Sequence, residues 1–191
     1  MIFKIILLML IAIVIEINAR VRFEDLENKE EIIVNPKRDQ FRYVPAIRYI
    51  HKDCFEFWVR APSAIQISLS NAPQYIDPKI NIVLGDHSNM KSAIYINGTN
   101  FWLSSTPNIL DTREYRSFWI KWSIKGKIWV GKGDEIMPFM VFESPEQFYP
   151  INFIGIASID SEASFVVNEG NFCKNVNKCL EGGIVTKLPK E

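Results

Sequence analysis

The sequence predicts an all-β protein, a two-sheet antiparallel β-sandwich of jelly-roll type. Short stretches in which apolar and polar residues alternate recur along the chain, about every ten residues. Residues typical of turns separate these stretches. No segment of the 191-residue chain keeps an apolar stripe of helical period for three turns. A closed β-barrel is the second alternative, because the same strands can also close on themselves.

The clearest strand pattern lies at residues 116–133 and predicts a β-hairpin. One apolar face is formed by Phe118, Ile120, Trp122, Ile124, Ile128 and Val130. The turn is expected at residues 125–127, where Gly126 can take a positive φ. Trp119 and Trp129 are out of step with this face. We therefore expect both indoles on the opposite side of the sheet, either under a loop or at a binding surface.

Further strands follow from the same alternation. They are expected at residues 54–61, 65–70, 79–84, 92–96, 101–103, 139–142, 151–158 and 164–167. Asn97-Gly98 is a typical hairpin-turn dipeptide between two of them. These strands place one β-sandwich domain at residues 54–170.

The two ends of the chain differ from this domain. Residues 1–19 have a basic start, an uninterrupted apolar run and a small residue, Ala19, at a cleavage point, which predicts a secretory signal peptide. The run, residues 5–15, is too short for a membrane span, and Glu16 ends it. Residues 20–53 are expected to form an irregular N-terminal extension, with one helical turn at residues 26–31. Residues 171–191 are expected to form a polar tail.

Charge limits the expected partners, and the cysteines indicate a disulfide in an exported protein. The chain has 22 basic and 22 acidic residues, so no basic excess attracts nucleic acid or anionic lipid. Export favours a disulfide, and the three cysteines leave the pairing open. We expect Cys54 to pair with Cys173 or Cys179; a local Cys173–Cys179 bridge is the alternative. Localisation is therefore predicted to be extracellular.

Several of these segments resemble the farnesoic acid O-methyltransferase-type domain of arthropods. The resemblance rests on residues 55–61, 65–70 and 80–85 with Asn89 and Ile94, on residues 118–122 with Gly126, Ile128, Val130, Gly131 and Gly133, and on residues 153–157. It implies a β-sandwich typical of secreted proteins. The family name further implies methyl transfer from S-adenosylmethionine to an isoprenoid acid. Where the family often has two glycines, Asp86 follows Gly85 here.

The residues themselves give little support to methyl transfer. The usual cofactor site needs a glycine-rich turn between a strand and a helix. Gly131-Lys132-Gly133 follows a strand, but no helix pattern follows it. We therefore predict no catalytic residue and no cofactor; S-adenosylmethionine would be needed only if the enzyme alternative holds.

A binding module is the favoured function, with a glycan or an apolar small molecule as ligand. Trp58, Tyr95, Trp119 and Trp129 are the candidate contact residues, because they oppose the core-facing positions of their strands. Asp86 and Asn89 share a loop with His87 and Ser88, and their oxygens can bind a hydroxylated ligand or calcium, or simply water. Asn97-Gly98-Thr99 is an N-glycosylation sequon.

Two alternatives to this function remain open. One is the methyltransferase that the family name implies. The other is a secreted defence or venom protein that binds another protein and no small ligand. The expected partners are accordingly an extracellular glycan, lipid or protein.

Overall fold

A computed structural model describes residues 30–34, 42–45, 53–72, 80–133, 135–144 and 150–167. The strands are β1 (Glu30–Val34), β2 (Arg42–Pro45), β3 (Cys54–Arg60), β4 (Ile65–Ser70), β5 (Ile80–Gly85), β6 (Lys91–Ile96), β7 (Thr99–Ser105), β8 (Arg116–Trp122), β9 (Lys127–Lys132), β10 (Met140–Glu143), β11 (Phe153–Ser158) and β12 (Ala163–Val167). A four-residue helical turn, α2 (Asp86–Asn89), joins β5 to β6. The prediction of an all-β fold is confirmed.

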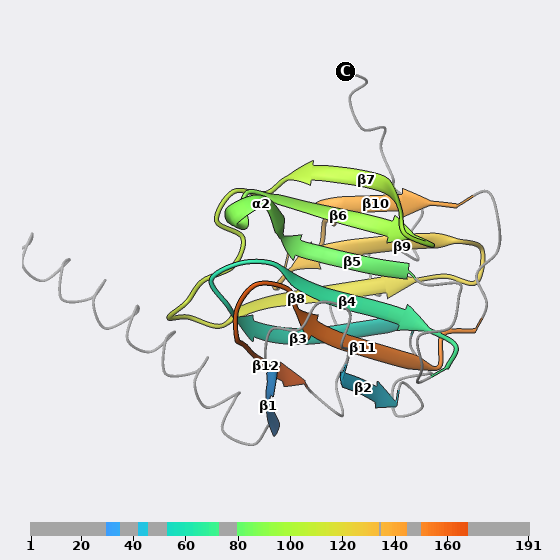
Figure 1. Ribbon diagram of the computed structural model, residues 1–191. Helices are drawn as coiled ribbons and strands as arrows, with labels where there is room; N and C mark the ends of the chain where they lie inside the picture. Colours follow the sequence, from blue (N-terminus) through green and yellow to red (C-terminus); the bar gives the residue numbers. More distant parts are fainter. Residues whose placement is uncertain are drawn as a thin grey trace, which may run out of the picture. The chain divides into compact units, whose positions relative to one another are not determined.

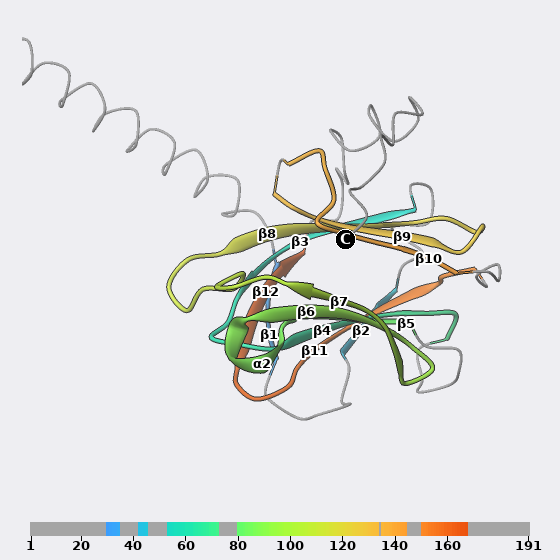
Figure 2. The same cartoon turned by 90° about the horizontal axis from the view of Figure 1, so that it is seen from above.

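The strands form two layers. Within the described residues, sheet A has the order β1-β12-β3-β8-β9-β10 and sheet B the order β2-β11-β4-β5-β6-β7. From β2 to β12, neighbouring strands pair antiparallel: β2–β11, β11–β4, β4–β5, β5–β6, β6–β7, β12–β3, β3–β8, β8–β9 and β9–β10. Sheet B lies in front in Figure 1, and Figure 2 shows the two layers from above. The chain crosses between the layers several times, which gives the predicted jelly-roll-like sandwich.

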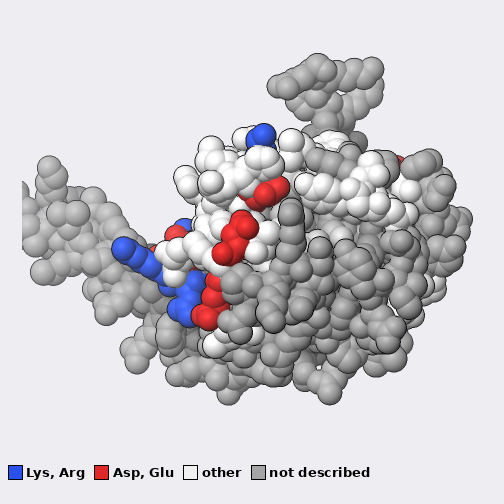
Figure 3. Space-filling model, viewed as in Figure 1, with Lys and Arg blue, Asp and Glu red and all other residues white. Residues whose placement is uncertain are grey.

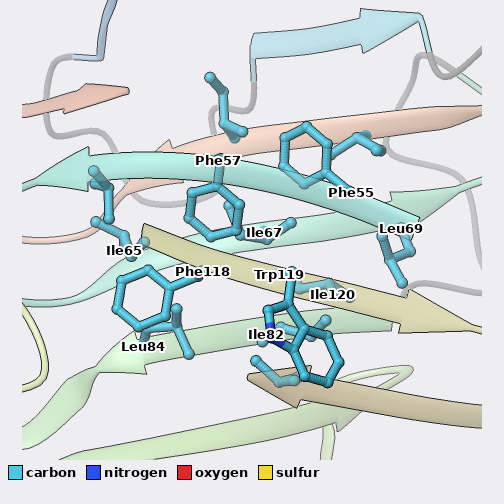
Figure 4. Close-up of a cluster of buried hydrophobic side chains, with 14 of the residues drawn as sticks. Phe55, Phe57, Ile65, Ile67, Leu69, Ile82, Leu84, Phe118, Trp119 and Ile120 are labelled. Carbon is cyan, nitrogen blue, oxygen red and sulfur yellow. The ribbon is translucent and has the colours of Figure 1, made fainter. Parts of the chain in front are cut away.

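The core lies between the two sheets and consists of the apolar residues that alternate along each strand. Sheet A contributes Phe55, Phe57, Val59, Phe118, Ile120 and Trp122, and sheet B contributes Ile65, Ile67, Leu69, Ile82, Leu84, Ile94, Ile154 and Ile156. Figure 4 shows part of this cluster. The Phe57 ring lies 5.2 Å from that of Phe55 and 5.7 Å from that of Phe118, measured between centroids. Tertiary packing of this kind fixes which face of each strand points inward.

The β8–β9 hairpin agrees with the expected pattern except at its turn. Trp122 is buried in the core, but Ile124 is 66% exposed. The strand ends at Trp122, and the turn is made by residues 123–126, where Gly126 has a φ of 85°. The backbone N–H of Ser123 donates to the carbonyl of Lys127, so Lys127 already belongs to β9. The prediction of a core position for Ile124 is wrong, because alternation of side chains ends where the pleat ends.

Two described segments within residues 20–53, Glu30–Val34 and Arg42–Pro45, are strands and differ from the expected irregular extension. β1 lies beside β12, and β2 pairs with β11, so each sheet gains an edge strand from this segment. Glu30 and Glu31 belong to β1, which excludes the expected helical turn at these two positions. Edge pairing with strands more than a hundred residues later leaves little local trace in the sequence. The predicted signal peptide and the tail 171–191 lie outside the described residues.

Candidate functional site

Three tryptophans lie on the outer face of sheet A, the face that points away from sheet B. In the strand register, Trp58 of β3 is opposite Ser117 of β8, Trp119 of β8 is opposite Gly131 of β9, and Trp129 of β9 is opposite Lys121. The tryptophans are therefore diagonal neighbours, one on each of three adjacent strands. This arrangement confirms the prediction that they face away from the core.

Trp119, the middle member of this diagonal, is buried with 1% of its surface exposed. Its indole Nε1 donates a hydrogen bond to the backbone carbonyl of Glu135 at 2.9 Å. Below the ring lies Gly131, where even a Cβ atom would overlap the indole. The prediction that Trp119 contacts a ligand is therefore wrong for this conformation, because the loop after β9 covers the ring.

Trp129 is partly exposed and has charged neighbours. Lys121 and Val141 are its partners on the adjacent strands. The Lys127 ammonium lies 5.9 Å from the Trp129 ring centroid and forms an ion pair with Glu143 at 2.9 Å. We call these five residues the Trp129 patch. An indole face beside hydrogen-bonding groups can pack against the C–H face of a sugar while the polar groups contact its hydroxyls. Trp58, also partly exposed, lies at the other end of the diagonal.

The Asp86–Asn89 turn is built around unusual backbone angles. His87, Ser88 and Asn89 all have positive φ values, of 50°, 58° and 65°. Such left-handed residues cost about 1–2 kcal/mol each. The Asn89 side chain offsets part of this cost, because its Nδ2 donates to the carbonyl of Leu110 at 2.9 Å and its Oδ1 accepts the Leu110 N–H at 3.0 Å.

These two hydrogen bonds give Asn89 a structural role, since both ends of its amide are occupied. Asp86 accepts a hydrogen bond from the backbone N–H of His87 at 2.8 Å and lies 3.1 Å from its Nδ1. Within the described ranges, no group of three His, Cys, Asp or Glu side chains is arranged to hold a metal ion. Asn89 thus ties the turn to the loop before β8. A ligand contact at Asn89 stays a prediction.

Tyr95 lies on the other side of the sandwich, on the outer face of sheet B, where it is opposite Asn81 of β5. On its other side, Asn81 is opposite Ser68 of β4. Neither Asn81 nor Ser68 was predicted as a site residue. Both side chains are buried, although their position in the strand pattern points away from the core. The only sequence feature that could have indicated Ser68 is that Gln66, Ser68 and Ser70 alternate with core residues. This pattern is typical of any half-exposed strand.

The remaining predicted sites lie at the ends of strands. Asn97 is exposed in the β6–β7 turn, where Asn97 and Gly98 have φ values of 50° and 77°, so the predicted hairpin turn is confirmed. Glycosylation at Asn97 stays a prediction. Cys54 is buried at the start of β3. Its two candidate partners, Cys173 and Cys179, lie outside the described residues, so the pairing also stays a prediction.

The protein is thus a two-sheet antiparallel β-sandwich with the Trp129 patch on the outer face of sheet A. The family model described as farnesoic acid O-methyl transferase matches residues 36–171. The chain therefore belongs to that family, which confirms the resemblance. No curated protein matches the chain significantly.

Solved structures with related sandwiches include a galectin, LEC-6 of Caenorhabditis elegans, at 15% identity and a TM-score of 0.46, covering 72% of this chain and 95% of the galectin. The carbohydrate-binding module CBM66 of Bacillus subtilis has 10% identity and a TM-score of 0.47, with 65% and 75% covered. A β-glucanase of Bacillus licheniformis has 10% identity and a TM-score of 0.45, with 73% and 76% covered. Similarities this weak carry no inference about function.

Proposed function

We propose that this protein is a secreted, non-catalytic module that binds extracellular glycans through the Trp129 patch. The observation that carries the proposal is the partly exposed Trp129 indole, flanked by Lys121 and by the Lys127–Glu143 ion pair. A rigid sheet holds these side chains, so little conformational entropy is lost on binding. An apolar small molecule is the second ligand class, with Trp129 and Val141 as its contact residues.

The geometry around Gly131 and Gly133 supports a function without S-adenosylmethionine. These glycines are the nearest match to a cofactor-binding turn, but the Trp119 ring already fills the space over Gly131. The N–H of Gly133 donates to the Ser117 carbonyl at 2.8 Å, so it is not available to a phosphate or carboxylate. Among the described residues, β9 leads into a loop and β10 rather than into a helix. The Gly131-Lys132-Gly133 turn therefore does not fit the cofactor that the family name implies.

Location outside the cell is part of the same proposal. It is supported by the predicted signal peptide and by the exposed sequon at Asn97. Among the residues that the structure describes, no helix is long and apolar enough to cross a membrane.

A glycan array probed with the purified mature protein tests the proposal, with a lipid panel run in parallel. Trp129→Ala should weaken binding to at least one glycan that is found, by about 0.5–1.5 kcal/mol beyond the loss of buried area, the range known for aromatic pairs. Ile124→Ala is the matched control, since it removes an exposed apolar side chain from the neighbouring turn. If Trp129→Ala bound every glycan that is found as tightly as the wild type does, the Trp129 patch would be excluded as a glycan site.

Two further results would favour the alternatives. Labelled S-adenosylmethionine offered with farnesoic acid should give no methyl ester; turnover would make the protein an enzyme. If the protein bound no glycan and no lipid but did bind another protein, the alternative of a secreted defence or venom protein without a small ligand would be favoured.

A further inference from the structure

A row of outward-facing positions crosses the middle of sheet B. The register places Ser68 of β4 opposite Gly155 of β11 and opposite Asn81 of β5, and Asn81 opposite Tyr95 of β6. Directly opposed side chains on antiparallel strands lie about 5 Å apart. Ser68, Asn81 and Tyr95 therefore form a continuous line across three adjacent strands.

Two polar atoms in this row lack hydrogen-bond partners. Ser68 Oγ and Asn81 Oδ1 are both buried, at 0% and 8% residue exposure, and neither forms a hydrogen bond. Ser161 Oγ, outside this row, is also buried without a partner. Two other hydroxyls of the sandwich are paired: Ser92 Oγ lies 2.7 Å from Thr106 Oγ1, and Ser70 Oγ donates to the carbonyl of Ala72 at 2.8 Å. Leaving a buried polar atom unpaired is costly, and native proteins rarely do so without a reason.

The hydrogen-bonding properties of these two atoms determine which ligand group can pair with both. The Ser68 hydroxyl can donate and accept, whereas Asn81 Oδ1 can only accept. A ligand hydroxyl has the matching properties, because its oxygen accepts from Ser68 and its hydrogen donates to Asn81. Adjacent hydroxyls of one sugar ring satisfy both atoms at once.

The rest of the row favours a neutral ring. Exposure rises from Ser68 through Asn81 to Tyr95, which is partly exposed, so the β6 end of the row is nearest to solvent. The Tyr95 ring can pack against the C–H face of a sugar. The row itself contains no charged side chain. Figure 3 shows this side of the molecule, and the Lys, Arg, Asp and Glu side chains of its described surface gather mainly toward the end where α2 lies.

From these observations we infer that the outer face of sheet B holds a second ligand site, for a neutral hexopyranose, with Ser68 and Asn81 as its hydrogen-bonding pair and Tyr95 as its stacking surface. It lies on the opposite face of the sandwich from the Trp129 patch. The two sites can thus be occupied independently.

The test uses the mature protein and three probes, the methyl glycosides of glucose, galactose and mannose, measured by calorimetry. At least one should bind, and Ser68→Ala or Asn81→Ala should weaken that binding about tenfold or more, the equivalent of ~1.4 kcal/mol. Because the Ser68 hydroxyl has no internal partner, Ser68→Ala should leave the unfolding temperature of the free protein unchanged or raise it. Trp129→Ala should leave this binding intact.

Ser70→Ala is the matched control, since Ser70 is the next outward-facing residue of β4 and is also buried. Its hydroxyl is paired with the backbone of Ala72, so this change should lower the unfolding temperature and leave glycoside binding intact. No binding of any probe by the wild type would overturn the inference. So would a fall in the unfolding temperature of Ser68→Ala as large as that of Ser70→Ala, because an ordered water alone would then satisfy the hydroxyl.

Discussion

The indole nitrogen of Trp119 and the backbone carbonyl of Glu135, 16 residues apart, are joined by a hydrogen bond of 2.9 Å. This bond holds the loop after β9 over the outer face of sheet A. The ring lies flat enough against the sheet to be covered because its partner on β9 is Gly131. Gly131 thus lets the Trp119 ring be buried against the sheet, while Trp129, on the next strand, stays partly exposed.

Gly131→Ala should lower the free energy of unfolding by about 1–3 kcal/mol, the usual cost of overpacking, because the added Cβ overlaps the Trp119 ring. Gly98→Ala is the control. Its Cβ would meet no atom, but Gly98 has a φ of 77°, so this change reports the backbone cost alone, about 1 kcal/mol. Urea denaturation of both variants measures the difference. A Gly131→Ala protein as stable as the wild type would show that Trp119 is not held in place.

The inward register of β8 is tested by two neighbouring residues. Trp122→Ala should lower the free energy of unfolding by about 3–5 kcal/mol, since it empties a large site in the core. Lys121→Ala, on the outer face, should cost less than about 0.5 kcal/mol. Chemical denaturation measures both values. Similar losses for the two variants would mean that the strand is shifted by one residue.

Asn89 should contribute to stability rather than to binding. Asn89→Ala removes two hydrogen bonds to the Leu110 backbone and places an alanine at a φ of 65°. We expect a loss of about 2–4 kcal/mol. Asn89→Gly removes the same bonds but tolerates the backbone angle, so it should be the more stable variant by about 1 kcal/mol. Thermal unfolding measures the stability of both variants. Equal stability of Asn89→Ala and Asn89→Gly would show that the positive φ at this position costs no free energy.

Asp111 should make stability depend on acid pH. The backbone N–H groups of Arg113 and Glu114, and then the Arg116 side chain, lower the pKa of this carboxyl from 3.8 to about 2. A pKa lowered in the folded state stabilises the fold above the unfolded value and loses this effect as the pH falls through the folded value. The stability difference between the wild type and Asp111→Asn should therefore be constant above about pH 5 and shrink between about pH 4 and pH 2. Urea titrations across this range measure it; a difference that stays constant down to pH 2 would contradict the assignment.

Export should remove residues 1–19. N-terminal sequencing of the secreted protein should then begin at Arg20, because the apolar run ends before the small residue Ala19. Asn97→Gln should remove one glycan from the secreted protein, as seen by its mass. Retention in the membrane with Met1 still present would contradict the first expectation, and an unchanged mass would contradict the second.

The sequence alone determined the class of fold. Period-two patterns placed the strands from β3 to β12 to within a few residues, because a half-buried strand must alternate and the segments are short and separated by turns. The same patterns showed that Trp58, Trp119 and Trp129 face away from the core. They also identified the Asn97-Gly98 turn, whose two positive φ values are a local property of these residues.

The tertiary structure decided what covers each outward-facing residue. Alternation says which side of a sheet a residue is on, but Trp119 is buried and Trp129 partly exposed only because a distant loop folds back onto one of them. Likewise, β1 and β2 exist as strands because late strands of each sheet offer them an edge. Ser68 and Asn81 become neighbours only through the register of β4 against β5, a relation between strands that no local pattern encodes.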